Sequence, residues 1–270
     1  MSKIEEALEK ARILRESEGD DQGDKFDNFR MLEPKKVDNP YIITATLPDS
    51  PISEEYRRLK SMLIRDTKTN FLNTIMVTSS VEAEGKTLTA INLAITLAQE
   101  IDHTILLIDA DMRKPMVHEY LGISYELGLS DYLTGDMDLS EVLIKTGIGN
   151  LMLIPAGHTV HNPVELLSSD KMKTLIKEVK HRYVDRYVII DTPPILPFAD
   201  AISIGELADG VLFVVKERHV QRKSIENAMN LLKDSRILGV VFNHASVENL
   251  DGHYSRYYYY NNKYKKKEKK

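Results

Sequence analysis

Three consecutive residues, Gly85, Lys86 and Thr87, carry the clearest chemical signal in this sequence of 270 residues. They follow a strand-like apolar segment and begin a segment whose apolar spacing predicts a helix. The first turn of a helix presents unpaired backbone N–H groups and a partial positive charge, so it binds phosphate oxygens. A lysine there neutralises terminal phosphates, and a threonine hydroxyl is a ligand for Mg²⁺. The motif therefore predicts a phosphate-binding loop for ATP and Mg²⁺.

The loop departs from the general pattern, which has glycine six residues before the lysine. Ser80 stands at that position. Taken alone, the short motif is also compatible with a surface loop that caps a helix. We expect the nucleotide to contact Glu84, Gly85, Lys86, Thr87 and Leu88.

Aspartates end two further apolar stretches. Asp109 closes the stretch ILLID and Asp191 closes the stretch YVIID. Because the carboxyl ends of parallel strands form the ligand-binding edge of a sheet, both should lie beside the loop. Together with Thr87 they would give Mg²⁺ the hard oxygen ligands that it prefers. Asp111, two residues beyond Asp109, could face a nucleophile.

Strand-like and helix-like segments alternate through the middle of the chain. Strands are expected at 73–80, 103–109, 150–157, 186–194, 209–216 and 237–245. Helices are expected at 86–100, 163–168, 170–182, 198–206, 220–235 and from Ser53, as N-cap, to about 65. This alternation predicts an α/β fold with a doubly wound, mostly parallel sheet.

The remaining segments define the domain organisation that we expect. Residues 1–17 have a narrow apolar stripe typical of a helix, and residues 18–49 are rich in acidic residues, glycine and proline, as in a linker. Residues 50–245 form the α/β domain, and residues 246–270 form a polar, flexible tail. The first helix is either a docking element for a partner or a helix that folds back on the domain.

Composition excludes several classes of protein. The net charge of −5 gives no indication of nucleic-acid binding. The absence of cysteine excludes disulfides, thiol catalysis and cysteine-ligated metals. No apolar run reaches eighteen residues, and the N-terminus does not resemble a secretory signal. We therefore expect a cytoplasmic protein.

Six tyrosines fall within the last seventeen residues. They are Tyr254, Tyr257, Tyr258, Tyr259, Tyr260 and Tyr264. Arg256 and six lysines against Glu268 give this segment a charge of 7 − 1 = +6. Since the tyrosines do not alternate with polar residues, a mobile substrate tail is favoured over an aromatic strand or a docking patch. The lysines either face solvent or contact anionic lipid.

Several motifs together resemble the cytoplasmic domain of bacterial protein-tyrosine kinases, which act in exopolysaccharide and capsule export. The matching stretches are TSSVEAEGKT, ILLIDADMRKP, VIIDTPP, HNPVELLSS and EEYRRLK, followed by the tyrosine-rich tail. The first three are similar to the family's Walker A, Walker A′ and Walker B motifs. The N-terminal SKIEEALEKA is similar to soluble autokinases associated with exosortase systems, whose membrane partner is a separate chain.

The resemblance implies a P-loop NTPase fold of the ParA/MinD-like branch and autophosphorylation of the tail tyrosines. It implies catalytic roles for Lys86, Asp109, Asp111 and Arg113. Asp111 would be the base that takes the phenolic proton. Arg113 would either assist phosphoryl transfer or pair with a carboxylate. Asn243 would face the adenine edge, or it is an ordinary residue that begins a loop.

The resemblance also implies partners. These are a membrane-anchored polysaccharide co-polymerase or activator, a cognate phosphatase, and other copies of the chain, assembled as a homo-oligomer such as a ring. The oligomerisation helix would contribute Glu54, Arg57 and Lys60, although Lys60 replaces the arginine of the family pattern. Activity at the inner face of the membrane would come through the partner.

Two further positions bear on the alternative functions. Ala83 replaces the glycine of the family's loop and costs about 1 kcal/mol if its φ is positive. Val81 stands where partitioning ATPases carry a signature lysine, which argues against that group. The alternatives to a kinase are an ATPase switch without kinase activity and a scaffold with a degenerate loop.

Overall fold

The computed structural model describes residues 30–31, 37–68, 72–99, 104–181 and 186–246. The helix expected at 1–17 and all six tail tyrosines lie outside these residues. Within the segment expected as a linker, 18–49, the structure describes a short helix, α2 (Ile43–Thr46), beside the fully buried Ile42. The division of the chain into domains stays a prediction.

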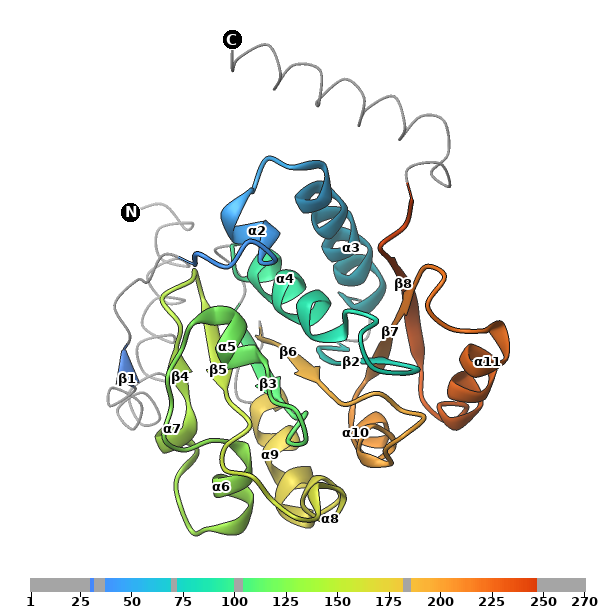
Figure 1. Ribbon diagram of the computed structural model, residues 1–270. Coiled ribbons are helices and arrows are strands. Elements are labelled where there is room, and N and C mark those ends of the chain that lie inside the picture. Colours follow the sequence, from blue (N-terminus) through green and yellow to red (C-terminus); the bar gives the residue numbers. More distant parts are fainter. Residues whose placement is uncertain (1–29, 32–36, 69–71, 100–103, 182–185, 247–270) are drawn as a thin grey trace, which may run out of the picture.

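The described residues form an α/β fold around one eight-stranded sheet, in the order β1-β4-β5-β3-β6-β2-β7-β8 (Figure 1). The strands are β1 (Arg30–Met31), β2 (Thr74–Ser79), β3 (Thr104–Asp109), β4 (Ile144–Lys145), β5 (Leu151–Ile154), β6 (Arg186–Asp191), β7 (Gly210–Lys216) and β8 (Ile237–Asn243). All paired strands are parallel except β4 with β5. The predicted doubly wound, mostly parallel sheet is thus confirmed.

Helices cover both faces of this sheet, as its connections require. The helices besides α2 are α3 (Pro51–Lys68), α4 (Lys86–Ala98), α5 (Val117–Leu121), α6 (Leu129–Thr134), α7 (Leu139–Val142), α8 (Pro163–Leu167), α9 (Asp170–His181), α10 (Asp200–Leu207) and α11 (Arg222–Leu231). Side chains of α3, α4 and α5 pack into one hydrophobic core. Those of α6 to α11 pack into the other, on the opposite face.

Strand β3 shows why the central strands are apolar throughout. Ile105 and Leu107 enter the core on the α4 face, and Leu106 and Ile108 enter the opposite core. All four are fully buried. A strand covered on both faces cannot alternate apolar and polar residues, so its sequence reads as a continuous apolar run.

Helix α3 begins two residues before the expected cap, so the prediction of Ser53 as N-cap is wrong. The helix starts at Pro51, whose fixed φ suits a first turn, and Ser50 Oγ accepts a hydrogen bond from Ser53 N at 3.1 Å. The Ser53 hydroxyl instead donates to Leu47 O at 2.8 Å and so ties α3 to the segment after α2.

Candidate active site

The phosphate loop, residues 80–87, connects β2 to α4 at the carboxyl edge of the sheet. It makes two left-handed turns, at Ala83 (φ 62°) and Gly85 (φ 94°). Glycine adopts this conformation without strain, whereas alanine pays a steric cost of about 1 kcal/mol. Ala83 therefore has the positive φ for which we expected a steric cost.

Gly85 is required for a second reason. A Cβ atom on this residue would lie 2.1 Å from Nδ2 of Asn243, at the end of β8. The same nitrogen donates to Glu84 O at 2.9 Å, and the Asn243 Oδ1 accepts from His244 N at 2.9 Å. Asn243 is thus engaged with the loop backbone, and an additional role at the adenine edge stays a prediction.

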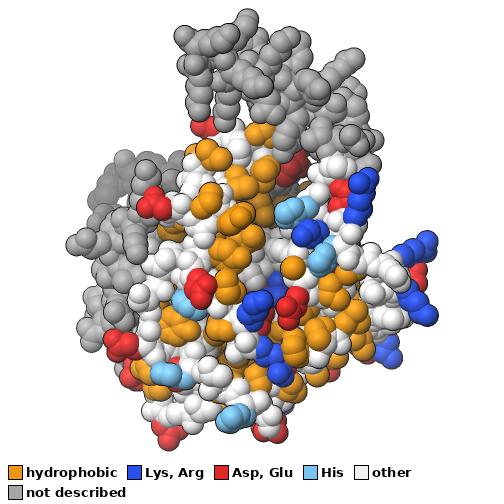
Figure 2. Space-filling view, in the orientation of Figure 1, with side chains coloured by type: hydrophobic (Ala, Val, Ile, Leu, Met, Phe, Trp, Pro, Cys, Tyr) orange, Lys and Arg blue, Asp and Glu red, His pale blue; other side chains and the backbone are white. Residues whose placement is uncertain are grey.

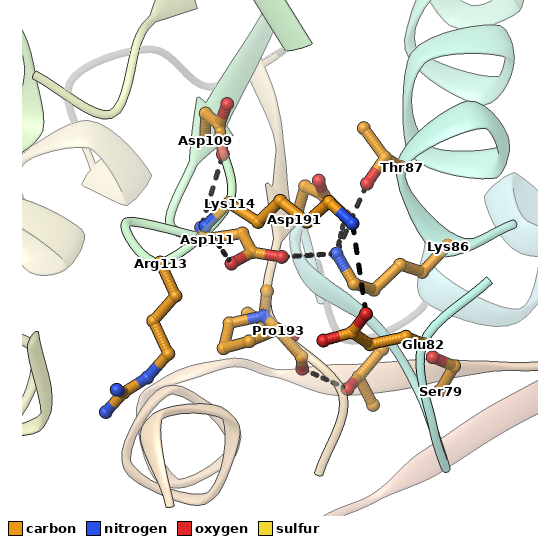
Figure 3. Close-up of polar contacts among 12 residues, drawn as sticks. Ser79, Glu82, Lys86, Thr87, Asp109, Asp111, Arg113, Lys114, Asp191 and Pro193 are labelled. Carbon is orange, nitrogen blue, oxygen red and sulfur yellow. Dashed lines mark hydrogen bonds and ion pairs between the residues drawn. The ribbon is translucent and has the colours of Figure 1, made fainter. Parts of the chain in front are cut away.

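Lys86 is the first residue of α4 and lies among three oxygen groups (Figure 3). Its Nζ donates to Asp111 Oδ2 at 2.6 Å and to Thr87 Oγ1 at 3.2 Å, and it lies 3.9 Å from Asp191 Oδ1. Although burial of the ammonium lowers its pKa, the charges of Asp191 and Asp111 outweigh burial and raise the Lys86 pKa overall. Lys86 is therefore a cation that carboxylates hold at the phosphate-binding end of the helix.

Asp109 and Asp191 end adjacent strands and face each other in register. Both are completely buried. Asp109 accepts backbone hydrogen bonds from Asp111 N and Val117 N, each at 3.2 Å. Among the described residues, no group makes a hydrogen bond of good geometry to either carboxylate oxygen of Asp191.

These environments change the acidity of both groups. Burial raises the pKa of Asp191 to about 6, and the neighbouring Lys86 charge and Thr87 hydroxyl act in the opposite direction. Burial, together with the charge of Asp191, raises the pKa of Asp109 well above its usual range. Each carboxylate therefore gains stability if a cation is placed nearby.

Arg113 follows β3 and makes a two-point ion pair. Its Nε donates to Asp200 Oδ2 at 2.6 Å and its Nη2 donates to Asp200 Oδ1 at 3.1 Å. Its guanidinium also lies 4.5 Å from the centre of the Phe198 ring. The sequence left two roles open for Arg113, assistance to phosphoryl transfer and pairing with a carboxylate. In the structure without nucleotide, Arg113 pairs with the carboxylate of Asp200.

A cavity of about 460 Å³ opens beside these groups. Its wall combines the phosphate loop, Asp111 and Arg113 with apolar side chains that include Met116, Tyr120 and Phe198. On the surface, basic and acidic side chains lie together near the middle of this face, next to apolar ones (Figure 2). The cavity can hold a charged group at its lysine end and an apolar ring against its wall.

The site has oxygen atoms of the kind that coordinate a Mg²⁺ ion. The Thr87 hydroxyl, the Asp191 oxygens, which accept no hydrogen bond from the described residues, and the adjacent Asp109 are hard oxygen groups. No group of three acidic or histidine side chains suited to a metal occurs among the described residues. A Mg²⁺ ion usually keeps several waters and takes further ligands from phosphates.

Sequence reasoning missed two contributors. Asp200, at the start of α10, looked like an ordinary residue of a helical first turn, although it is fully buried against Arg113. The nucleotide contact expected of Glu84 stays a prediction, but sequence reasoning did not anticipate that its side chain is fully buried within the loop. The sequence offered one signal of the Glu84 contact with Ser80: an acid four residues after a serine, within a loop that contains glycine.

The residues expected to act in oligomerisation lie on α3. Glu54 and Arg57 form an ion pair at 2.7 Å, and Arg57 also donates to Pro48 O at 2.9 Å. Lys60 lies one turn further along the same helix. The apolar side chains of Leu47, Ile52 and Met62 are each about half exposed in this region.

None of the helices that the structure describes is both long and apolar enough to cross a bilayer.

Comparisons with known proteins bear directly on this site. A family model described as an AAA domain matches residues 73–237. The chain is 32% identical over 212 residues to the putative tyrosine-protein kinase CapB of Staphylococcus aureus, with 78% of this chain and 92% of the relative covered. It is 35% identical over 204 residues to the tyrosine-protein kinase YwqD of Bacillus subtilis, with 75% and 85% covered.

A solved structure agrees with these relatives. The kinase domain of the Escherichia coli tyrosine kinase ETK matches with a TM-score of 0.70 and 31% identity, covering 76% of this chain and 82% of that domain. The similarity to the curated relatives extends over most of both chains. The chain therefore belongs to the family of bacterial protein-tyrosine kinases.

Proposed function

We propose that this chain is an ATP- and Mg²⁺-dependent protein-tyrosine kinase that phosphorylates the tyrosine cluster of its own C-terminal tail. One observation carries the proposal: Lys86, Thr87, Asp111 and Asp191 meet at the carboxyl edge of the sheet, and Asp191 has no hydrogen-bond partner among the described residues. This arrangement suits a metal-bound triphosphate next to a candidate base. The kinase names of the relatives support the same chemistry.

In this proposal Mg²⁺, when bound, neutralises negative charge on the phosphate oxygens. Thr87 and Asp191 would hold it, with Asp109 beside them. The helix N-terminus and Lys86 would bind the phosphates. To do so Lys86 exchanges part of its 2.6 Å contact with Asp111 for phosphate oxygens. That exchange frees an oxygen of Asp111 to accept a proton.

The transfer itself moves one phosphoryl group and one proton. The tyrosine oxygen forms a bond to the terminal phosphorus, the bond to the bridging oxygen of ADP breaks, and Asp111 takes the phenolic proton. A phenol has a pKa of about 10, so it reacts poorly without such a base. Arg113, paired with Asp200, would hold the loop that carries Asp111.

The acceptors in this proposal are Tyr254, Tyr257, Tyr258, Tyr259, Tyr260 and Tyr264, all outside the described residues. Each phosphate adds a charge of roughly −1.5 to −2, so full modification would reverse the charge of +6. In this proposal the tail enters the site of a neighbouring copy.

The test incubates the full chain with Mg-ATP and maps phosphotyrosine by mass spectrometry. We expect modification of tail tyrosines, and we expect its loss in Lys86→Met and Asp111→Ala variants. ATP turnover without phosphotyrosine would instead identify an ATPase switch. Absence of nucleotide binding would identify a scaffold with a degenerate loop.

We also propose that α3 assembles the chain into a homo-oligomer through Glu54, Arg57 and Lys60, and that a basic tail favours assembly. The half-exposed apolar residues near α3 support a contact surface there. Mass measurement in solution before and after treatment with Mg-ATP tests this. An unchanged mass despite full tyrosine modification would contradict it.

The same proposal places the chain in exopolysaccharide or capsule assembly, in the cytoplasm at the inner face of the membrane. A membrane-anchored co-polymerase would activate it through residues 1–17, and a phosphatase would reset it. Deletion of residues 1–17 should reduce activation by that partner without reducing basal ATP binding. Equal loss of both would argue against docking.

A further inference from the structure

Glu84 is a fully buried acid in a loop whose neighbouring residues, Glu82 and Ala83, are exposed. Its Oε2 accepts two hydrogen bonds, from Ser80 Oγ at 2.6 Å and from Val81 N at 2.9 Å. The side chain therefore turns back into its own loop. It closes the segment between the end of β2 and the start of α4 as a compact ring.

The other oxygen of this carboxylate connects the loop to the neighbouring strand. Glu84 Oε1 accepts a hydrogen bond from Lys216 N, the last residue of β7, at 3.3 Å. The backbone oxygen of Glu84 accepts from Asn243 at the end of β8. One residue thus joins the loop to two strand ends that are distant in the sequence.

Ser80 occupies the position where the general loop pattern has glycine. In this chain the serine is completely buried and its hydroxyl donates to Glu84. The serine that departs from the general pattern is therefore the partner of the buried glutamate. A side-chain hydrogen bond fixes a turn that would otherwise depend on glycine.

We propose that Glu84 is a positioning residue for the nucleotide. It does not contact the phosphates with its carboxylate, but it holds the phosphate loop in its binding conformation through Ser80, Val81 and Lys216. The inference rests on the proposed nucleotide site and assigns Glu84 a different role from that of Lys86 and Thr87. Its effect is on nucleotide affinity, because a loop that is closed only part of the time binds with a proportionally weaker apparent affinity.

Glu84→Gln is the informative substitution. Donors face both carboxylate oxygens, with Ser80 and Val81 on one side and Lys216 on the other. A glutamine has one oxygen and one NH₂ group, so either orientation sets the NH₂ group against a backbone N–H. A buried donor left without an acceptor is costly, and we expect about a tenfold increase in the Kd for Mg-ATP.

The experiment titrates the full-length chain with a fluorescent ATP analogue and Mg²⁺, and measures turnover at saturating ATP. The expected result is weaker binding with a maximal rate within about threefold of the original, since the lysine and the proposed base remain. Glu226→Gln on α11 is the matched control, because that exposed acid pairs only with Arg222 in the structure and lies outside the loop. An unchanged Kd in Glu84→Gln would overturn the inference, as would a fall in maximal rate at unchanged Kd.

Ser80→Ala keeps the test decisive if the glutamine variant does not fold, as judged by its thermal unfolding. It removes one donor and keeps the Val81 contact, so the Kd should rise by a smaller factor. In the double variant the increase should be smaller than the product of the two single increases, because both changes disrupt one interaction. Independent, multiplying effects, or a Ser80→Ala variant that binds normally, would refute the pairing.

These measurements separate the inference from the proposed function. A chain that binds nucleotide, loses affinity in Glu84→Gln and forms no phosphotyrosine would refute the kinase and support the positioning role. A chain that phosphorylates its tail and binds ATP equally well with glutamine at position 84 would refute the positioning role alone.

Discussion

Strands β3 and β6 are adjacent and end in paired aspartates, yet the two strand ends differ. At the end of β3, Asp109 accepts backbone hydrogen bonds from Asp111 N and Val117 N and so shapes the loop that follows. At the end of β6, Asp191 is equally buried but has no such partner. The Lys86 ammonium lies 3.9 Å from its Oδ1.

The difference separates a structural carboxylate from one that is available to a ligand. Burying a charged group without hydrogen bonds costs several kcal/mol unless a cation compensates. Asp109 recovers part of that cost from the backbone. Asp191 recovers part of it from the Lys86 ammonium at 3.9 Å, and its oxygens accept no hydrogen bond, so we expect Asp191 to contact Mg²⁺ more directly than Asp109 does.

The largest predicted effect comes from Asp191→Asn. We expect Mg²⁺-dependent tyrosine phosphorylation to fall at least about 100-fold, because a metal ligand contributes several kcal/mol to the transition state. The stability of the nucleotide-free protein should change little or rise, since the buried charge removed accepts no hydrogen bond and lies at the 3.9 Å limit of an ion pair with Lys86. Phosphotyrosine quantification and thermal unfolding measure the two effects, with the exposed Asp170→Asn as control. If Asp191→Asn kept its tyrosine phosphorylation activity, the distinction drawn between Asp191 and Asp109 would be wrong.

Asp109→Asn should act mainly on stability. Either orientation of the amide sets its NH₂ group against the N–H of Asp111 or of Val117, which leaves a buried donor unpaired. We expect a loss of about 1–3 kcal/mol in the free energy of unfolding, measured with denaturant in the absence of nucleotide. A stability loss that is larger for Asp191→Asn would reverse our assignment of the two roles.

The pH dependence of stability gives a third test, with the protein free of metal in EDTA. The pKa of Asp191 is about 6 when folded, against 3.8 for a normal aspartate. Between these values the folded chain binds more protons than the unfolded chain, so this group's contribution is complete below about pH 4 and is lost as the pH rises to about 6. Asp191→Asn should flatten that part of the stability curve. An unchanged slope would contradict the raised pKa.

The smallest effect concerns the second attachment of the loop after β3. Arg113→Lys keeps the charge but loses the two-point contact with Asp200, so we expect a stability loss of no more than about 1 kcal/mol. Denaturant unfolding measures it. A loss as large as that of Asp109→Asn would mean that the arginine, not the strand-end aspartate, holds this loop.

The central fold was predictable because its signals are local and repeated. Each strand of the central sheet is a short apolar run, and α4 follows directly from the Gly-Lys-Thr turn. The region 112–149 was not predictable. Its helices have four to six residues each, which is too short to show a helical period.

The candidate site was predictable only in part. The rule that parallel strands meet at their carboxyl ends was sufficient to bring Asp109, Asp191 and the phosphate loop together. The contacts of Arg113 with Asp200 and of Glu84 with Lys216 join residues far apart in the sequence. They depend on how the crossover connections stack, and residue spacing contains no information about that.

The close approach of Gly85 to Asn243 affects how substitutions in this loop should be interpreted. In a mutational library, any side chain at position 85 would collide with the Asn243 amide and would also strain the turn. An inactive variant at this position could therefore reflect the lost hydrogen bond from Asn243 to the loop as much as the loss of a phosphate contact. Only a paired change that shortens residue 243 could separate the two causes.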